Sequence, residues 1–216
     1  MTNRSKWLVA IPFVFLIAFA LPAVLAGEWL WFEDDWAETL FVALTAGMWL
    51  VATAFVDVSR PRGPRDRTDI LIPLALILAV PVSVIDRLYG PGRNFPSWLS
   101  VLGILLGFSA VALGISARLA LAQAYQPRAT VQPNSQLIRS GPYRFIRHPM
   151  YSAAVLWAAG WPLIIGSITG AVVTGLILLP ALIARMKREE AGLHKEFGQE
   201  YDSYCADTWR MFPSLF

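Results

Sequence analysis

The sequence predicts an all-α integral membrane protein with about six transmembrane helices. Of its 216 residues, 56% are hydrophobic, and the mean hydropathy of +0.52 is well above that of a soluble domain. The apolar residues are gathered into runs, several of them close to the roughly 20 residues that a helix needs to cross a bilayer core. Six runs are candidates: Trp7–Ala26, Trp36–Val56, Ile70–Leu88, Trp98–Ala122, Tyr151–Gly166 and Thr169–Ala184.

The first run and the last two need separate interpretation. The first follows Arg4 and Lys6 and ends in Ala-Val-Leu-Ala-Gly, a pattern that a cleaved signal peptide shares, but we expect a retained helix. The last two runs are short, so we expect a helical hairpin that turns at Gly166–Gly170. Because six helices take up most of the chain, any chemistry must take place between helices or at the membrane surface.

The basic residues predict the orientation of the helices. All of the 18 except Arg87 and Arg93 fall on one side of the predicted membrane. Loops rich in lysine and arginine stay in the cytoplasm, so both termini are expected there. The pI of about 9.2 then follows from topology and requires no nucleic-acid partner.

Cysteine content and the absence of repeats disfavour several classes of protein. Cys205 is the only cysteine, so the chain has neither an intrachain disulfide nor a multi-cysteine metal site, and we expect no bound metal. No internal repeat is evident, which disfavours a transporter built from inverted repeats. Gly103, Gly107 and Gly114 suit close helix contacts within or between subunits, so the oligomeric state stays open.

A polar, cation-rich segment, Leu137–Tyr151, lies between the fourth and fifth apolar runs. It holds one of only two histidines and arginines that neither solubility nor membrane spanning explains. Gly141-Pro142 is a turn signal, and His148-Pro149 places a proline at the expected start of a helix. The backbone N–H groups at such a helix start favour anionic ligands.

A second polar segment, Arg185–Cys205, follows the sixth run. It is expected to form an amphipathic helix on the cytoplasmic membrane surface. The residues that recur every four positions along it are Arg185, Glu189, Leu193, Phe197 and Tyr201.

The carboxylates of this second segment require partners. Glu189 and Glu190 enter a face that should be buried, and a buried charge is costly unless it is paired. The arginines of residues 139–147 are the candidate partners. Because the hairpin returns the chain to the side where it started, His148 and Arg185 are expected at the same membrane face.

Together the two segments resemble a known family. Gly141 to Tyr151 reads Gly-Pro-Tyr-Arg-Phe-Ile-Arg-His-Pro-Met-Tyr, and Arg185-x-x-x-Glu-Glu follows after a short apolar hairpin, with Leu, Phe-Gly and two tyrosines further on. This order and spacing resemble the isoprenylcysteine carboxyl methyltransferase family, and more broadly the membrane methyltransferases that include phospholipid N-methyltransferases. The similarity covers about Leu137–Pro213.

The resemblance implies a cofactor and roles for individual residues. S-adenosylmethionine would bind between the two segments. Arg185 and Arg147 would be catalytic, with Arg185 where substrate and cofactor meet. Gln136 stands where many relatives have a histidine, so that imidazole is not carried over. The residues that would bind the cofactor are Leu137, Gly141, Tyr143, Arg147, His148, Tyr151, Glu189 and Glu190.

The resemblance also implies a division of the chain and a function. Residues 1–125 would form the transmembrane scaffold and substrate region, and residues 126–216 the cofactor-binding catalytic region. The favoured function is carboxyl O-methylation of an isoprenylcysteine-like or other apolar acid delivered from the membrane, with lipid as a partner. The alternatives are methylation of a lipid amine or small thiol, a sterol-type membrane reductase that uses NADPH, and a membrane assembly or lipid-binding protein without chemistry.

Overall fold

The computed structural model describes residues 68–89, 96–124 and 137–213, and every regular element in these ranges is a helix. The predicted runs Trp7–Ala26 and Trp36–Val56 lie outside the described residues. The other four runs are helical, as predicted: α4 (Thr68–Tyr89), α5 (Ser97–Ala124), α6 (Pro149–Ile165) and α7 (Ile168–Phe197). A short 3₁₀ helix, η2 (Gly141–Arg144), and the short helix α8 (Gln199–Asp207) complete the fold.

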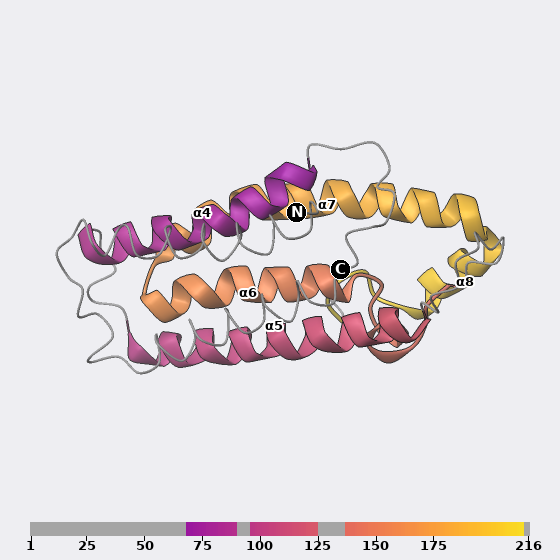
Figure 1. Ribbon diagram of the computed structural model, residues 1–216, viewed down its shortest axis with the longest axis horizontal. Helices are drawn as coiled ribbons and strands as arrows, with labels where there is room; N and C mark the ends of the chain where they lie inside the picture. Colours follow the sequence, from indigo (N-terminus) through magenta and orange to yellow (C-terminus); the bar gives the residue numbers. More distant parts are fainter. Residues whose placement is uncertain (1–67, 90–95, 125–136, 214–216) are drawn as a thin grey trace, which may run out of the picture.

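The four long helices form a bundle in which consecutive helices run in opposite directions (Figure 1). α5 packs mainly on α6, and α4 mainly on α7. The chain passes from α6 into α7 at one end of the bundle, whereas η2, the start of α6 and α8 lie toward the other end (Figure 1). This second end is where the two polar segments of the sequence meet.

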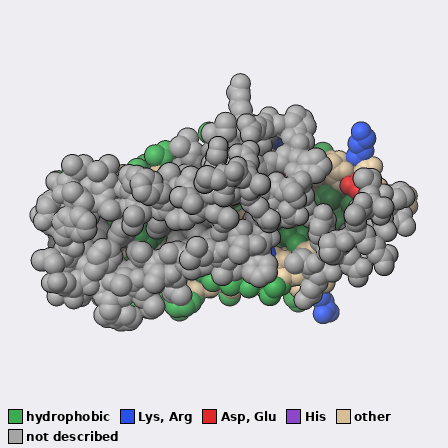
Figure 2. All heavy atoms as spheres, viewed as in Figure 1, with side chains coloured by type: hydrophobic (Ala, Val, Ile, Leu, Met, Phe, Trp, Pro, Cys, Tyr) green, Lys and Arg blue, Asp and Glu red, His purple; other side chains and the backbone are tan. Residues whose placement is uncertain are grey.

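Two of the described helices, α5 and α7, are long and apolar enough to cross a membrane. In α5, Trp98–Leu121 has a mean hydropathy of 2.2, and large side chains such as Val101 and Leu105 are exposed. A helix that is apolar on all sides suits a lipid environment. On the face that Figure 2 shows, apolar side chains line the edge along α5, and the most prominent charged ones lie toward the end that holds α8.

The predicted hairpin is formed by α6 and α7. α6 has 17 residues, or roughly 25 Å at 1.5 Å per residue, which is shorter than a bilayer core of about 30 Å. Gly166 ends it in the left-handed conformation, with a φ of 78°. The Ser167 hydroxyl then accepts a hydrogen bond from the Gly170 N–H at 2.8 Å and caps α7.

Helices α5 and α6 approach each other closely at two glycines. A Cβ added to Gly103 would lie 2.8 Å from the Gly160 carbonyl oxygen and 2.8 Å from the Ile164 nitrogen. A Cβ on Gly160 would lie 2.9 Å from the Gly103 carbonyl oxygen. Only glycine allows two backbones this close, so Gly103, one of the glycines singled out in the sequence, makes its contact within the chain.

The core between the helices is apolar and rich in tryptophan. Trp157 and Trp161 of α6 stack with their ring centroids 6.4 Å apart. They pack in one cluster with Leu178, Leu182 and Met186 of α7, all of which are buried. This cluster fixes α6 against α7, and therefore the start of α6 against the charged half of α7.

A buried carboxylate, Asp86, lies at the hairpin end of the bundle, where no sequence pattern predicts a site. Its Oδ2 accepts hydrogen bonds from the Ser167 hydroxyl at 2.7 Å and the Thr169 N–H at 3.2 Å. Asp86 belongs to α4 and the two donors to the start of α7. A negative charge is stabilising at a helix N-terminus, so Asp86 attaches α4 to α7.

The amphipathic helix predicted over Arg185–Cys205 is divided differently in the structure. α7 continues without a break from its apolar part, which ends at Ala184, through to Phe197. The chain turns at Gly198, which has a φ of 53°, and α8 follows. The sequence predicts a new helix at Arg185, where the charged residues begin, but α7 is not interrupted there. The helix ends instead at Gly198, because glycine adopts the positive φ of this turn.

Candidate active site

The end of the bundle opposite the hairpin turn brings together three segments that are distant in sequence. Residues Phe145–His148 pair with the segment that follows α8, through a parallel bridge between Ile146 and Trp209. The Arg147 N–H donates to the Trp209 carbonyl at 2.8 Å, and the His148 N–H donates to the Arg210 carbonyl at 3.0 Å. The third segment is the charged half of α7.

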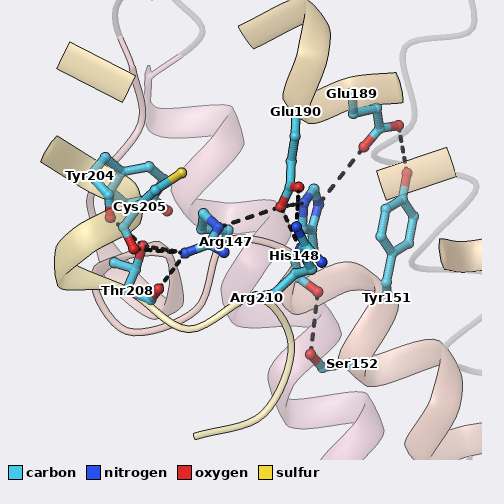
Figure 3. A network of polar contacts seen from close by, with 10 residues as sticks. All are labelled: Arg147, His148, Tyr151, Ser152, Glu189, Glu190, Tyr204, Cys205, Thr208 and Arg210. Atoms are coloured by element: carbon cyan, nitrogen blue, oxygen red, sulfur yellow. Dashed lines mark hydrogen bonds and ion pairs between the residues drawn. The ribbon is translucent and has the colours of Figure 1, made fainter. Parts of the chain in front are cut away.

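His148 is fixed at the start of α6. It is the residue before Pro149, the first residue of the helix, and its carbonyl accepts the N–H groups of Tyr151 at 3.0 Å and Ser152 at 3.1 Å. The Ser152 hydroxyl lies 3.3 Å from the His148 carbonyl (Figure 3). It also donates to the Met211 carbonyl at 2.6 Å, which joins the helix start to the C-terminal segment. The His148 side chain is buried, with 6% of its surface exposed.

Glu190 is the centre of a buried cluster of positive and hydrogen-bonding groups (Figure 3). Its Oε1 lies 3.2 Å from His148 Nε2 and 3.4 Å from Arg147 Nε. Arg210 binds it through two nitrogens, Nε to Oε1 at 2.9 Å and a terminal nitrogen to Oε2 at 2.8 Å. Only 13% of the Glu190 side chain is exposed.

These contacts keep Glu190 ionised. It lies beyond Ala184, outside the apolar part of α7. Burial alone would raise its pKa, but the hydrogen bonds and charges of His148 and Arg210 outweigh burial and hold the pKa at about 2, below the usual 4.5. Glu190 is therefore a permanent anion at neutral pH.

Glu189 lies beside this cluster and is more exposed to solvent (Figure 3). Its Oε1 accepts the Tyr151 hydroxyl at 2.5 Å and Arg185 Nε at 3.1 Å. Its Oε2 lies 3.9 Å from His148 Nδ1. The side chain is 41% exposed, and the rings of His148 and Tyr151 stack with centroids 5.4 Å apart. Glu189 is thus the more accessible of the two carboxylates.

Arg147 makes most of its contacts with the end of α8. One terminal nitrogen donates to the Cys205 carbonyl at 3.1 Å and also to the Thr208 carbonyl. A cation is favourable at the C-terminal end of a helix, where carbonyl groups lack partners. Arg147 consequently connects α8 to Glu190.

The segment before α6 is attached to α8. Gly141 has a φ of 58°, and a Cβ there would lie 3.1 Å from that of Ala120, so η2 packs tightly on α5. The Tyr204 hydroxyl donates to the Tyr143 carbonyl at 2.7 Å. Burial, with Tyr204 and Glu189 nearby, raises the pKa of Tyr143 to about 12, so its phenol stays protonated. Leu137 is partly buried at the start of this segment.

Of the arginines expected to pair with the two carboxylates, only Arg147 does so. Arg139 binds the Glu200 carbonyl at 2.8 Å, and Arg144 lies over the ring of Phe145. The arginine that makes the closest contact with Glu190 is Arg210, which lies outside the two polar segments that the sequence predicts to be functional. Nothing in its spacing connects it to Glu190, so the sequence indicates only a cytoplasmic charge there.

The fold and the site define a class: a helical membrane protein whose polar site lies where two ends of a helical hairpin meet a C-terminal helix. Comparison with known proteins agrees. Residues 98–200 match the family model described as phospholipid methyltransferase. This match includes both polar blocks, from Gly141 to Tyr151 and from Arg185 to Glu190.

Individual relatives point to a narrower family. The chain is 31% identical over 88 residues to a probable protein-S-isoprenylcysteine O-methyltransferase of Oryza sativa, covering 41% of this chain and 46% of the relative. It is 22% identical over 134 residues to protein-S-isoprenylcysteine O-methyltransferase B of Arabidopsis thaliana, covering 61% and 68%. It is also 31% identical over 131 residues to the cobalt-zinc-cadmium resistance protein CzcN of Cupriavidus metallidurans, covering 59% and 57%.

The chain matches about half the length of the first of these curated relatives. The matches confirm the predicted resemblance: the chain is similar to the isoprenylcysteine carboxyl methyltransferases and, over residues 98–200, to the phospholipid methyltransferases.

Proposed function

We propose that this protein is an integral membrane methyltransferase that uses S-adenosylmethionine and methylates the carboxylate of an apolar, membrane-delivered acid of the isoprenylcysteine type. The observation that carries the proposal is that two groups of polar side chains lie next to each other. One is buried and consists of His148 and Glu190. The other is accessible and consists of Tyr151, Arg185 and Glu189, which we call the polar row. Both groups lie at the ends of apolar helices, where a lipid-soluble acceptor and a water-soluble cofactor can meet.

The residues of the row suit this cofactor. S-adenosylmethionine supplies an electrophilic methyl group on a positively charged sulfur. Glu189 offers a carboxylate oxygen, Oε2, to a cation or a hydroxyl group, and the stacked rings of His148 and Tyr151 offer aromatic surface beside it. Methyl transfer depends mainly on alignment and exclusion of water, so positioning by these residues supplies the catalysis.

Arg185 is the residue that suits a carboxylate acceptor. Its side chain is 35% exposed and lies one helical turn before Glu189. A guanidinium holds a carboxylate in a defined orientation through paired hydrogen bonds. A carboxylate is already ionised at neutral pH and needs no general base, whereas an amine or thiol acceptor would have to lose a proton to Glu189 or His148.

The topology predicted from the sequence suits an acceptor that arrives from the bilayer. With six helices and both termini in the cytoplasm, the catalytic region of residues 126–216 would lie at the cytoplasmic face, next to membrane lipid. The relatives named protein-S-isoprenylcysteine O-methyltransferase support an acceptor of the lipidated, acidic class.

Calorimetric titration of the detergent-purified protein with S-adenosylhomocysteine tests the cofactor assignment, with NADPH as a control ligand. We expect saturable one-site binding of S-adenosylhomocysteine that is weakened in Glu189→Gln. Glu196→Gln is the matched control, because this exposed glutamate lies on the same helix about two turns beyond Glu189. Binding of NADPH instead would replace the proposal with the reductase alternative, and binding of neither by folded protein would refute both.

A further inference from the structure

The two adjacent glutamates differ in how many of their carboxylate oxygens accept hydrogen bonds. Both oxygens of Glu190 are engaged, by His148, Arg147 and Arg210, at 2.8 to 3.4 Å. Among the residues that the structure describes, Glu189 receives its donors on Oε1 alone, and its Oε2 lies 3.9 Å from His148 Nδ1. The sequence does not distinguish them, but within the described part of the chain Glu189 is the one of the two that has an oxygen without a hydrogen-bond donor.

The difference originates in the C-terminal segment. Arg210 follows the bridge between Ile146 and Trp209, and its own carbonyl accepts the His148 N–H. The same backbone pairing therefore fixes both the imidazole and the guanidinium that meet at Glu190. A bidentate contact between a guanidinium and a carboxylate fixes the direction of the carboxylate as well as its charge.

We propose that Arg210 is a positioning residue of this site, which clamps Glu190 as a fixed anion and so leaves Glu189 as the carboxylate that contacts the cofactor. The proposal rests on the proposed function and divides its paired glutamates into an anchor and a ligand. An ionised carboxylate only accepts hydrogen bonds, so Glu190 fixes the proton of His148 on Nε2. His148 Nδ1 and the Glu189 oxygen that faces it then line the accessible side of the site.

A double-mutant cycle in the full-length protein tests the clamp without any ligand. Thermal unfolding is measured for Arg210→Met, Glu190→Gln and the double variant, with Arg188→Met as the control on the exposed side of α7. We expect each single variant to lower the melting temperature and the double variant to be little worse than either, because the residues act as one unit. Additive losses would overturn the clamp.

Binding of S-adenosylhomocysteine and S-adenosylmethionine tests the division of the glutamates. We expect Arg210→Met to raise the dissociation constant by about 10- to 100-fold, because Glu189 would no longer be held in place and the ligand would lose one hydrogen bond to a charged group. Arg210→Lys should recover part of this loss. Glu189→Gln should weaken binding without lowering the melting temperature. A stronger effect on S-adenosylmethionine would assign Glu189 to the sulfonium, and an equal effect would assign it to a hydroxyl or ammonium group that both ligands carry.

Three results separate failure of the inference from failure of the proposed function. Unchanged affinity of Arg210→Met for both ligands would show that the contact between Arg210 and Glu190 serves stability only. If Arg210→Met does not fold, Arg210→Lys takes its place in this test. The roles of the two glutamates would be reversed if Glu190→Gln bound the ligands more weakly at an unchanged melting temperature while Glu189→Gln bound them as the unaltered protein does. If the unaltered protein binds neither ligand, the proposed function fails, and the unfolding cycle alone decides whether Arg210 clamps Glu190.

Discussion

Replacing Gly103 with alanine places a methyl group where α5 and α6 come closest. The new Cβ would lie 2.8 Å from each of three atoms: the Gly160 carbonyl oxygen, the Ile164 nitrogen and Ile164 Cγ1. Two of these are backbone atoms of α6, which cannot rotate away as a side chain can. The two helices would have to separate.

The expected loss follows from two opposing terms. Overpacking costs about 1–3 kcal/mol, and the rigid backbone contacts put Gly103 at the upper end. Alanine in place of glycine stabilises a helix by about 1 kcal/mol. The net loss is about 2 kcal/mol, or a fall in melting temperature of about 4–8 °C for a chain of this size.

Gly175 of α7 provides the matched control, because no described atom lies within 4 Å of a Cβ added there. Gly175→Ala should have only the stabilising effect of alanine in a helix and should raise the melting temperature by about 2–4 °C. Thermal unfolding in detergent, followed by circular dichroism, measures both variants. If Gly103→Ala is as stable as the unaltered protein or behaves like Gly175→Ala, the close packing of α5 on α6 is wrong.

Three further predictions concern the site and the opposite end of the bundle. Because the pKa of Glu190 is lowered from 4.5 to about 2, its contribution to stability is complete above pH 4.5 and is lost as pH falls toward 2. Unfolding of Glu190→Gln should lack this part of the acid sensitivity, and equal sensitivity in both proteins would contradict the assignment. Arg147→Lys should lower the melting temperature, because lysine cannot reach the end of α8 and Glu190 together. Unchanged stability would contradict the role of Arg147 in connecting the end of α8 to Glu190. Asp86→Asn should cost about 1 kcal/mol of stability through the weakened cap of α7. Its affinity for S-adenosylhomocysteine should stay unchanged, and a shift in affinity would refute the separation of the two ends.

The positions of the helices were predictable from sequence because apolar run length is a direct physical constraint. Tyr151–Gly166 and Thr169–Ala184 were both identified as helices, and the turn between them falls at Gly166 and Ser167. The meeting of His148 with the charged half of α7 was also predictable, since a hairpin brings its two ends to one side.

Contacts that depend on side-chain direction were beyond reach of the sequence. Arg210 and Glu190 are 20 residues apart, on segments with no common periodicity, and only the pairing of Trp209 with Ile146 brings them together. Adjacent glutamates look alike in a sequence, yet helix geometry turns them toward different neighbours. The role of Asp86 is equally invisible in the sequence, because its partners lie at the start of a helix far along the chain.

Methyl transfer itself tests the central claim most directly. The purified protein in lipid vesicles is incubated with S-adenosylmethionine labelled in its methyl group and a farnesylated cysteine that has a free carboxylate. We predict a labelled methyl ester that alkali releases as methanol, strongly reduced in Glu189→Gln and retained in Glu196→Gln. Label that resists alkali would contradict carboxyl methylation, and equal transfer by both variants would contradict the site built around Glu189, Tyr151 and Arg185.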